Sequence, residues 1–296
     1  MMCLKEISLN EFADLFPDNP CKEGVVYNGA SFNKLNASKA EAVRPVVGYV
    51  DGHAVAGQIF GIRDGVARAP FSAPFSSLST SHDLSVNEFY DQVRCFLNMP
   101  LRLVWPPDFY PVPPAPDSYK RICEFNYHYP LQRFADYEKY LSRSGRYNHH
   151  RALKHNFEFI KTDNIGRVYS VIAENSRLMG YPLAMSLADV EATVRIIPAD
   201  FFLLTLDGAD VAAAMIYHVS PGIVQVIYWG DLPFGRFARS MNSLAWHIFG
   251  WYAAHCPDIK IIDIGPASTD GVRNEGLCQF KLSLGCIETL RPTIYI

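Results

Sequence analysis

The strongest constraint on this chain is a pattern of valine-rich segments punctuated by Asp-Gly pairs, which occurs twice. Residues 46–69 contain Asp51-Gly52 and Asp64-Gly65, and residues 201–230 contain Asp207-Gly208 and then a second turn sequence, Ser220-Pro221-Gly222. Asp-Gly readily adopts the positive φ angles of a tight hairpin turn, and the flanking β-branched residues favour strands. Each half therefore predicts a meander of three antiparallel strands.

In both halves the sequence after the meander predicts one amphipathic helix and then one more strand. The first helix follows Ser85, which has the form of a capping box with Glu88, and its strand spans residues 101–104. The second helix follows Ser240, and its strand spans residues 259–264. Both helices repeat apolar residues at three- and four-residue intervals. The two halves thus share the order β-β-β-α-β.

The two halves align at one offset, the 156 positions between Asp51 and Asp207. The pattern predicts an α/β (α+β) protein with two tandem units, residues 1–116 and residues 117–296, and two unrelated hairpins are the alternative. Trp105–Pro116 ends the first unit and contains six prolines in twelve residues. We interpret it as a stiff connector that packs on the protein, and the alternative is a proline-rich ligand for a recognition domain.

The segment after the connector is predicted to be mainly helical. Helices are expected over residues 131–141, 144–157, 167–179 and 188–197, with Gly180 as a C-cap. Residues 143–155 hold four Arg/Lys and three His, and Arg146, Arg151 and Lys154 are candidate substrate-binding residues. This basic segment is either a phosphate-binding surface for a nucleotide, coenzyme or RNA backbone, or a solvated helix face.

Composition excludes several classes of protein. The chain is 49% hydrophobic and 13% aromatic, which excludes a mostly disordered protein. Its net charge of −3 gives no whole-chain footprint for nucleic acid or an acidic membrane. Seven cysteines with no C-x-x-C spacing argue against a disulfide framework and a structural zinc site, and we predict no metal. The missing secretory signal and membrane span predict a cytoplasmic protein.

The C-terminal segment carries the most specific pattern. Asp263-Ile264-Gly265 is followed by Asn274-Glu275-Gly276-Leu277-x-x-Phe280-Lys281-x-x-x-Gly285. This pattern resembles the end of the Fem-type aminoacyl transferases and related proteins of the Gcn5-related N-acetyltransferase (GNAT) fold. Such proteins often contain two GNAT-like units in tandem, and residues 146–157 are similar to their basic stretch before the second unit. The resemblance covers most of residues 130–296 and, more faintly, the first half.

The resemblance implies an N-acyltransferase that moves an acyl or aminoacyl group from an activated donor to a small-molecule or peptide amine. Lys281, matching the FK lysine, would neutralise charge on the donor or oxyanion, Asp231 would serve as a base, and Phe280 would line the pocket. The implied catalytic residues are Lys281, Asp231 and Tyr228; the implied substrate-binding residues are Phe280, Trp229 and Asn274. For each of them the alternative is an ordinary packing role, with Lys281 extending from a buried face.

The donor site departs from the pattern of coenzyme A users. Those proteins have an R/Q-x-x-G-x-G/A loop, whereas residues 231–239 contain one glycine here. Arg236, Arg239 and Ser240 are therefore the candidate donor-phosphate contacts. No permanently bound cofactor is expected; the donor is acyl-CoA as a co-substrate or an aminoacyl-tRNA. The alternative function is a catalytically silent GNAT-like module that binds a peptide, glycan precursor or nucleotide. No oligomeric state is predicted.

Overall fold

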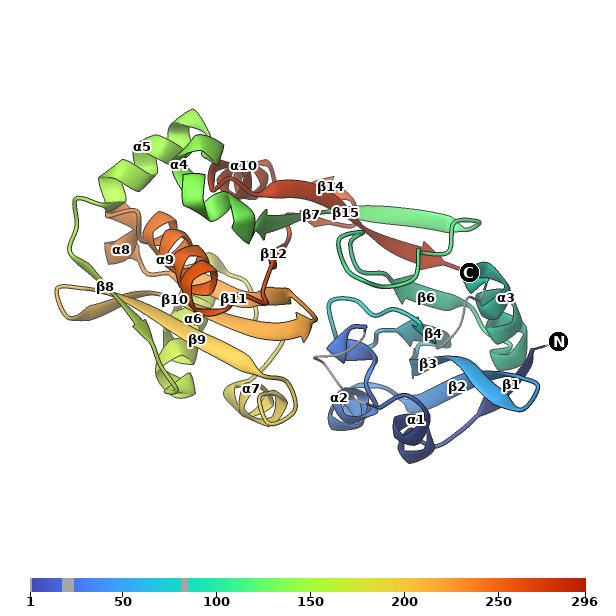
Figure 1. Ribbon diagram of the computed structural model, residues 1–296. Coiled ribbons are helices and arrows are strands. Elements are labelled where there is room, and N and C mark those ends of the chain that lie inside the picture. Colours follow the sequence, from blue (N-terminus) through green and yellow to red (C-terminus); the bar gives the residue numbers. More distant parts are fainter. Residues whose placement is uncertain (1, 18–23, 81–84) are drawn as a thin grey trace.

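The computed structural model describes residues 2–17, 24–80 and 85–296, and within these ranges one twisted sheet runs through the whole molecule (Figure 1). Its thirteen strands include a path in the order β1-β2-β3-β4-β6-β15-β7-β12-β11-β10-β9-β8, and the short β5 pairs with β3. Helices cover the sheet, which confirms the predicted α/β (α+β) class. The sheet continues across the connector, so the unit boundary at residue 116 stays a prediction.

The first half has the predicted order of elements. Its meander turns at Asp51 and Asp64, whose φ angles are 49° and 51°. Ser85 accepts a hydrogen bond from the Glu88 amide, so one half of the expected capping box is present. The elements are β1 (Cys3–Glu6), α1 (Leu9–Leu15), η1 (Val26–Asn28), α2 (Ala30–Leu35), η2 (Ala37–Lys39), β2 (Ala42–Val50), β3 (His53–Arg63), β4 (Val66–Ala69), β5 (Ser79–Thr80), α3 (Val86–Leu97) and β6 (Leu101–Val104).

The second half repeats this order with additional helices. Asp207, with φ 52°, makes the turn between the first two strands of its meander. The elements are β7 (Lys120–Pro130), η3 (Leu131–Asp136), α4 (Tyr137–Tyr140), α5 (Arg143–Ala152), β8 (Phe157–Lys161), α6 (Ile165–Met179), α7 (Leu187–Thr193), β9 (Ala199–Leu206), β10 (Ala209–Ser220), β11 (Ile223–Asp231), α8 (Pro233–Phe237), α9 (Ser240–His255), β12 (Ile261–Pro266), β13 (Ser268–Thr269), β14 (Val272–Arg273), α10 (Glu275–Ser283) and β15 (Ile287–Tyr295).

Several helix predictions need correction. The helix expected over residues 144–157 ends at Ala152, because Phe157 begins the edge strand β8 and pairs with Leu206. Residues 131–141 form a 3-10 helix and one short α-helix instead of one continuous helix. By contrast, α6 ends where predicted, at Gly180 with φ 73°. Short-range patterns identified these helices but not the competition from strand pairing.

Two strands that the sequence did not predict join the halves. The C-terminal strand β15 pairs antiparallel with β6 of the first half, through Thr293 and Val104, and with β7 along its whole length. Figure 1 shows β7 and β15 crossing from one half to the other. The C-terminal residues therefore complete the sheet of the N-terminal half.

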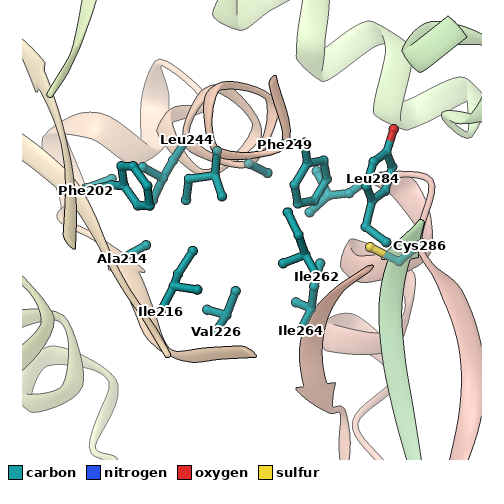
Figure 2. Close-up of a cluster of buried hydrophobic side chains, with 14 of the residues drawn as sticks. Phe202, Ala214, Ile216, Val226, Leu244, Phe249, Ile262, Ile264, Leu284 and Cys286 are labelled. Carbon is teal, nitrogen blue, oxygen red and sulfur yellow. The ribbon is translucent and has the colours of Figure 1, made fainter. Parts of the chain in front are cut away.

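The two faces of the second half have separate cores. On one face, side chains of β9, β10 and β12 pack against α9, as Figure 2 shows for Phe202, Ile216 and Phe249. The opposite face is covered by α6 and α7 together with segments of the first half, including Tyr27 and the connector residue Tyr110. The first half thus contributes directly to the core of the second.

Other sequence expectations concern thiols, membranes and metals. Cys21 lies outside the described residues, and the other six cysteines are free thiols. In the part of the chain that the structure describes, no helix is long and apolar enough to cross a membrane. The same ranges contain no cluster of three His, Cys, Asp or Glu side chains arranged to hold a metal.

A buried carboxylate ties the sheet edge to α9. Asp200 on β9 is only 6% exposed, and it accepts hydrogen bonds from His218 Nε2 and Tyr252 Oη, each at 2.7 Å. Lys161 Nζ on β8 lies 2.8 Å from the other carboxylate oxygen. Burial alone would raise the pKa of Asp200, but these hydrogen bonds lower it well below its usual range.

We expect Asp200→Asn to lower the free energy of unfolding by about 3 kcal/mol, since it removes the charge that pairs with Lys161 and that accepts the hydrogen bonds of His218 and Tyr252. A depressed folded-state pKa gives a contribution that is complete above the unfolded pKa of about 3.9 and is lost as the pH falls below it. Urea unfolding should therefore show a difference in the free energy of unfolding between wild type and variant at pH 7, and this difference should become smaller in acid. The exposed Asp270→Asn is the control; a small or pH-independent difference would contradict the prediction.

Candidate functional site

Two parallel strands separate in the middle of the second half. β11 and β12 pair only from Ile223 with Ile261 to Gln225 with Asp263. Beyond this point β11 continues to Asp231 along β10, and β12 continues to Pro266 along β7. The side of β11 that faces away from β10 therefore has no strand partner after Gln225 among the described residues.

A bulge and two aromatic side chains shape this divergence. Met215 of β10 opposes Tyr228, whereas Ile216 opposes Val226, so Ile227 is an extra residue in β11. Bulges bend a strand and redirect its side chains, and they are frequent beside active sites. Trp229 of β11 and Phe280 of α10 contact each other with ring centroids 6.0 Å apart, although they come from elements on opposite sides of the divergence.

Three residues predicted from sequence meet at the start of α9. The Asp231 carboxylate is 7% exposed and accepts hydrogen bonds from Arg236 Nε at 3.0 Å and from Ser240 Oγ at 2.9 Å. The Asp231 carbonyl accepts from Asn175 Nδ2 of α6 at 2.6 Å. Both carboxylate oxygens are thus held, and Asp231 fixes the end of β11 against the beginning of α9.

The turn before α9 uses its glycine for packing. A Cβ on Gly235 would lie 2.7 Å from the Val211 side chain and 2.8 Å from Ser240 Oγ, so only glycine fits there. Arg239 is the N-cap of α9 with φ 64°, and its buried Nε has no hydrogen-bond partner within the described ranges. The helix N-terminus and Arg239 together favour an anion at this position.

Asp263 marks the point at which the strands part. It is completely buried and accepts hydrogen bonds from four donors, two on each oxygen. One oxygen accepts from Asn126 Nδ2 at 2.8 Å and from the Gly265 amide at 2.9 Å. The other accepts from Tyr110 Oη and Gln225 Nε2, each at 2.8 Å. With all lone pairs engaged, this carboxylate holds the connector and β12 in place.

Lys281 points into the protein rather than into the divergence. Its ammonium is buried and donates to the carbonyls of Ile264 and Gly265 at 2.9 Å and of Pro266 at 2.8 Å. All three hydrogens are used by the end of β12, where the pairing with β11 has stopped. Burial lowers the pKa of Lys281 to about 8. This geometry favours a positioning role, and neutralisation of a donor or oxyanion stays a prediction.

The remaining predicted residues lie elsewhere. Tyr228 faces the α6–α7 side of the sheet, opposite to Trp229, where its hydroxyl accepts from the Ala184 amide at 3.2 Å and burial raises its pKa. Asn274 caps α10 by accepting from the Leu277 amide. The basic candidates Arg146, Arg151 and Lys154 occupy α5 and the residues just after it. No hydrogen bond or ion pair within the described ranges links any of these residues to Asp231.

Sequence reasoning missed the polar side chains around Asp263. Gln225, Asn126 and Tyr110 come from two strands and the connector, and Tyr27 adds a hydrogen bond to Gln225 at 2.7 Å. A signal was present, because an amide side chain inside the apolar run of a buried strand needs a partner. The partner, Asp263, lies between 38 and 153 positions away from these residues in the sequence, and no local pattern shows such a pairing.

Comparisons with known proteins identify the fold. No family model and no curated protein sequence matches the chain. Among solved structures, FemX has a TM-score of 0.63 at 10% identity, and the match covers 98% of this chain and 96% of FemX. A tandem GNAT protein from the clavulanic acid biosynthesis pathway has a TM-score of 0.58 at 10% identity, over 100% and 98% of the two chains.

L-PGS from Bacillus licheniformis is a third similar structure, with a TM-score of 0.58 at 15% identity over 97% of this chain and 90% of that one. These matches extend over nearly all of each chain, so both halves and their arrangement are shared. The chain has the GNAT-like Fem-type fold that its C-terminal pattern resembles. At identities this low the likeness concerns the fold, and chemistry has to be argued from the site.

We expect Lys281→Met to lower the free energy of unfolding by about 3 kcal/mol, because three carbonyls at the end of β12 lose their donor. The exposed Lys154→Met should change it by less than about 0.5 kcal/mol. Urea unfolding at pH 7 measures both variants. If Lys281→Met is as stable as the wild type, the ammonium does not anchor β12.

Proposed function

We propose that the second half of this protein is an N-acyltransferase that moves an acyl or aminoacyl group from an activated donor to an amine. The observation that carries this proposal is the divergence of β11 and β12 directly beside the N-terminus of α9. Along β11, the edge without a second strand partner begins after Gln225. Trp229, which contacts Phe280, follows on the same strand, and the chain then turns to the N-terminus of α9. The Fem-type fold supports the same reaction class.

The divergence supplies what acyl transfer requires. On the side of β11 that faces away from β10, the backbone groups beyond Gln225 have no strand partner among the described residues. They can hydrogen-bond an extended donor or its carbonyl oxygen, which polarises that carbonyl. Trp229 and Phe280 form an apolar wall for the donor chain. The N-terminus of α9, with Arg236 and Arg239, would face the donor's phosphates. Much of the rate would then come from positioning the donor next to the amine.

The geometry favours positioning roles for Asp231 and Lys281 over direct participation in the chemistry. Asp231 is bonded through both carboxylate oxygens, so it would orient Arg236 and Ser240 at the donor site rather than abstract a proton. Lys281 would fix the end of β12, which is one wall of the divergence. A loss of turnover in Lys281→Ala would therefore report a displaced strand as readily as a lost charge.

The first experiment is thermal unfolding with coenzyme A, acetyl-coenzyme A and longer acyl thioesters. A donor present at 100 times its dissociation constant adds about 2.7 kcal/mol of stability, which raises the midpoint by several degrees. We expect a selective rise with at least one thioester, or, if none has an effect, transfer of labelled amino acid from aminoacyl-tRNA to an amine. If neither donor binds or reacts, the protein is a silent binding module and the proposal is wrong.

A second experiment locates the donor. We expect Trp229→Ala to weaken binding of the active donor about tenfold, since it removes a large apolar contact worth about 1.4 kcal/mol or more. Phe96→Ala removes a 42% exposed aromatic side chain of α3 and should leave donor binding unchanged. Isothermal titration of both variants, with midpoints compared to confirm folding, measures the difference. Equal affinities would place the donor away from the divergence.

A further inference from the structure

An arginine near the divergence forms no hydrogen-bonded ion pair within the described residues. Arg291 lies on β15, and its Nε is buried without a hydrogen-bond partner among the described residues. The nearest acidic groups are engaged elsewhere: Asp263 accepts four hydrogen bonds, and Glu124 accepts from Ser268 Oγ and from the Gly271 amide. Both carboxylates are close enough to attract the guanidinium, but neither accepts a hydrogen bond from it, so its buried Nε lacks an acceptor that the carboxylate or phosphate of a ligand would supply.

Two buried acceptors on the neighbouring strand also lack partners. Asn126 is completely buried, and because its Nδ2 donates to Asp263, its unpartnered Oδ1 is left as an acceptor. His128 is 7% exposed, and its Nδ1 has no partner in the described ranges. Burial lowers the pKa of His128, which favours the neutral ring. In the tautomer that carries its hydrogen on Nε2, Nδ1 is an acceptor.

Strand register places the three groups on one face of the sheet. Asn126 and His128 are two positions apart on β7, so they point to the same side about 6.6 Å apart. Arg291 opposes Glu124, the next residue of β7 on that side, and directly opposed residues share a face. One cation and two acceptors are therefore gathered within three successive rows of β7 and β15.

This face adjoins the point at which β11 and β12 part. His128 opposes Asp263, which in turn pairs with Gln225, the last paired residue of β11. Adjacent strands are about 4.8 Å apart, so β11 lies about 10 Å away across β12. The connector covers this region, with the Phe109 ring 4.3 Å from the His128 ring.

Resting on the proposed function, we infer that this face binds the amine acceptor, and that the acceptor carries an anionic group beside its amine. The amine would donate to Asn126 Oδ1 and His128 Nδ1, and the carboxylate or phosphate would pair with Arg291. When the amine nitrogen bonds to the acyl carbonyl carbon, the bond from that carbon to the donor's sulfur or oxygen breaks. The neutral His128 would take the proton that the amine loses and pass it to the departing thiol or hydroxyl group.

The test measures acceptor binding without any donor. Protein with ¹⁵N-labelled histidine is titrated with α-amino acids and glycylglycine, which offer a carboxylate, and with O-phosphoethanolamine, which offers a phosphate. The His128 Nδ1 signal is assigned by its loss in His128→Gln. We expect at least one of these probes to shift it, while methylammonium and acetate, each with only one of the two groups, bind at least about tenfold more weakly.

Two variants distinguish binding at this face from binding elsewhere on the protein. Arg291→Gln breaks no hydrogen bond or ion pair of the described residues, so it should fold and should bind the active probe at least about tenfold more weakly. Arg121→Gln, at an exposed arginine of β7, should bind it as the wild type does. If no probe shifts His128, or if Arg291→Gln binds equally well, these atoms hold water only and the inference is wrong. Thioester binding is measured separately, so that failure would leave the proposed transferase standing.

Discussion

Parallel strands that separate inside a sheet leave backbone groups without partners, and this protein is organised around supplying those partners. At the end of β12, Lys281 donates to three successive carbonyls, and the Asp263 carboxylate accepts the Gly265 amide. Each unpaired buried group would cost free energy comparable to a lost hydrogen bond. The charged side chains thus satisfy the backbone groups of β12 at the divergence, while the facing edge of β11 has no strand partner beyond Gln225 among the described residues.

The two halves are coupled at this point. Tyr110 of the connector and Tyr27 of the first half reach Asp263 and Gln225, and the C-terminal strand β15 lies between β6 and β7. The geometry of the divergence therefore depends on segments from both ends of the chain. The first half supports the second, because it covers one face of the second half's core and its side chains bond to Gln225 and Asp263.

Much of the local structure followed from short-range rules. The Asp-Gly turns, α3 with its Ser85 cap and α6 with its Gly180 C-cap all depend on the preferences of neighbouring residues. The strands β7, β8 and β15 did not follow, because they are fixed by partners far along the chain. In the site, Asp231 and Ser240 were each predicted from local features and lie nine positions apart, whereas Asn126 and Asp263 are 137 positions apart.

Local features of the chain are enough to predict the class of fold, its repeated β-β-β-α-β order and the Fem-type pattern that ends the chain. These properties depend on turns, helix periodicity and a contiguous motif, all of which are local. Which side chains meet depends on how the chain folds: Lys281 is turned inward, Tyr228 lies on the opposite face from Trp229, and Asn126, His128 and Arg291 share one face of β7 and β15. Burial and long-range strand register control these placements, and neither can be read from neighbouring residues.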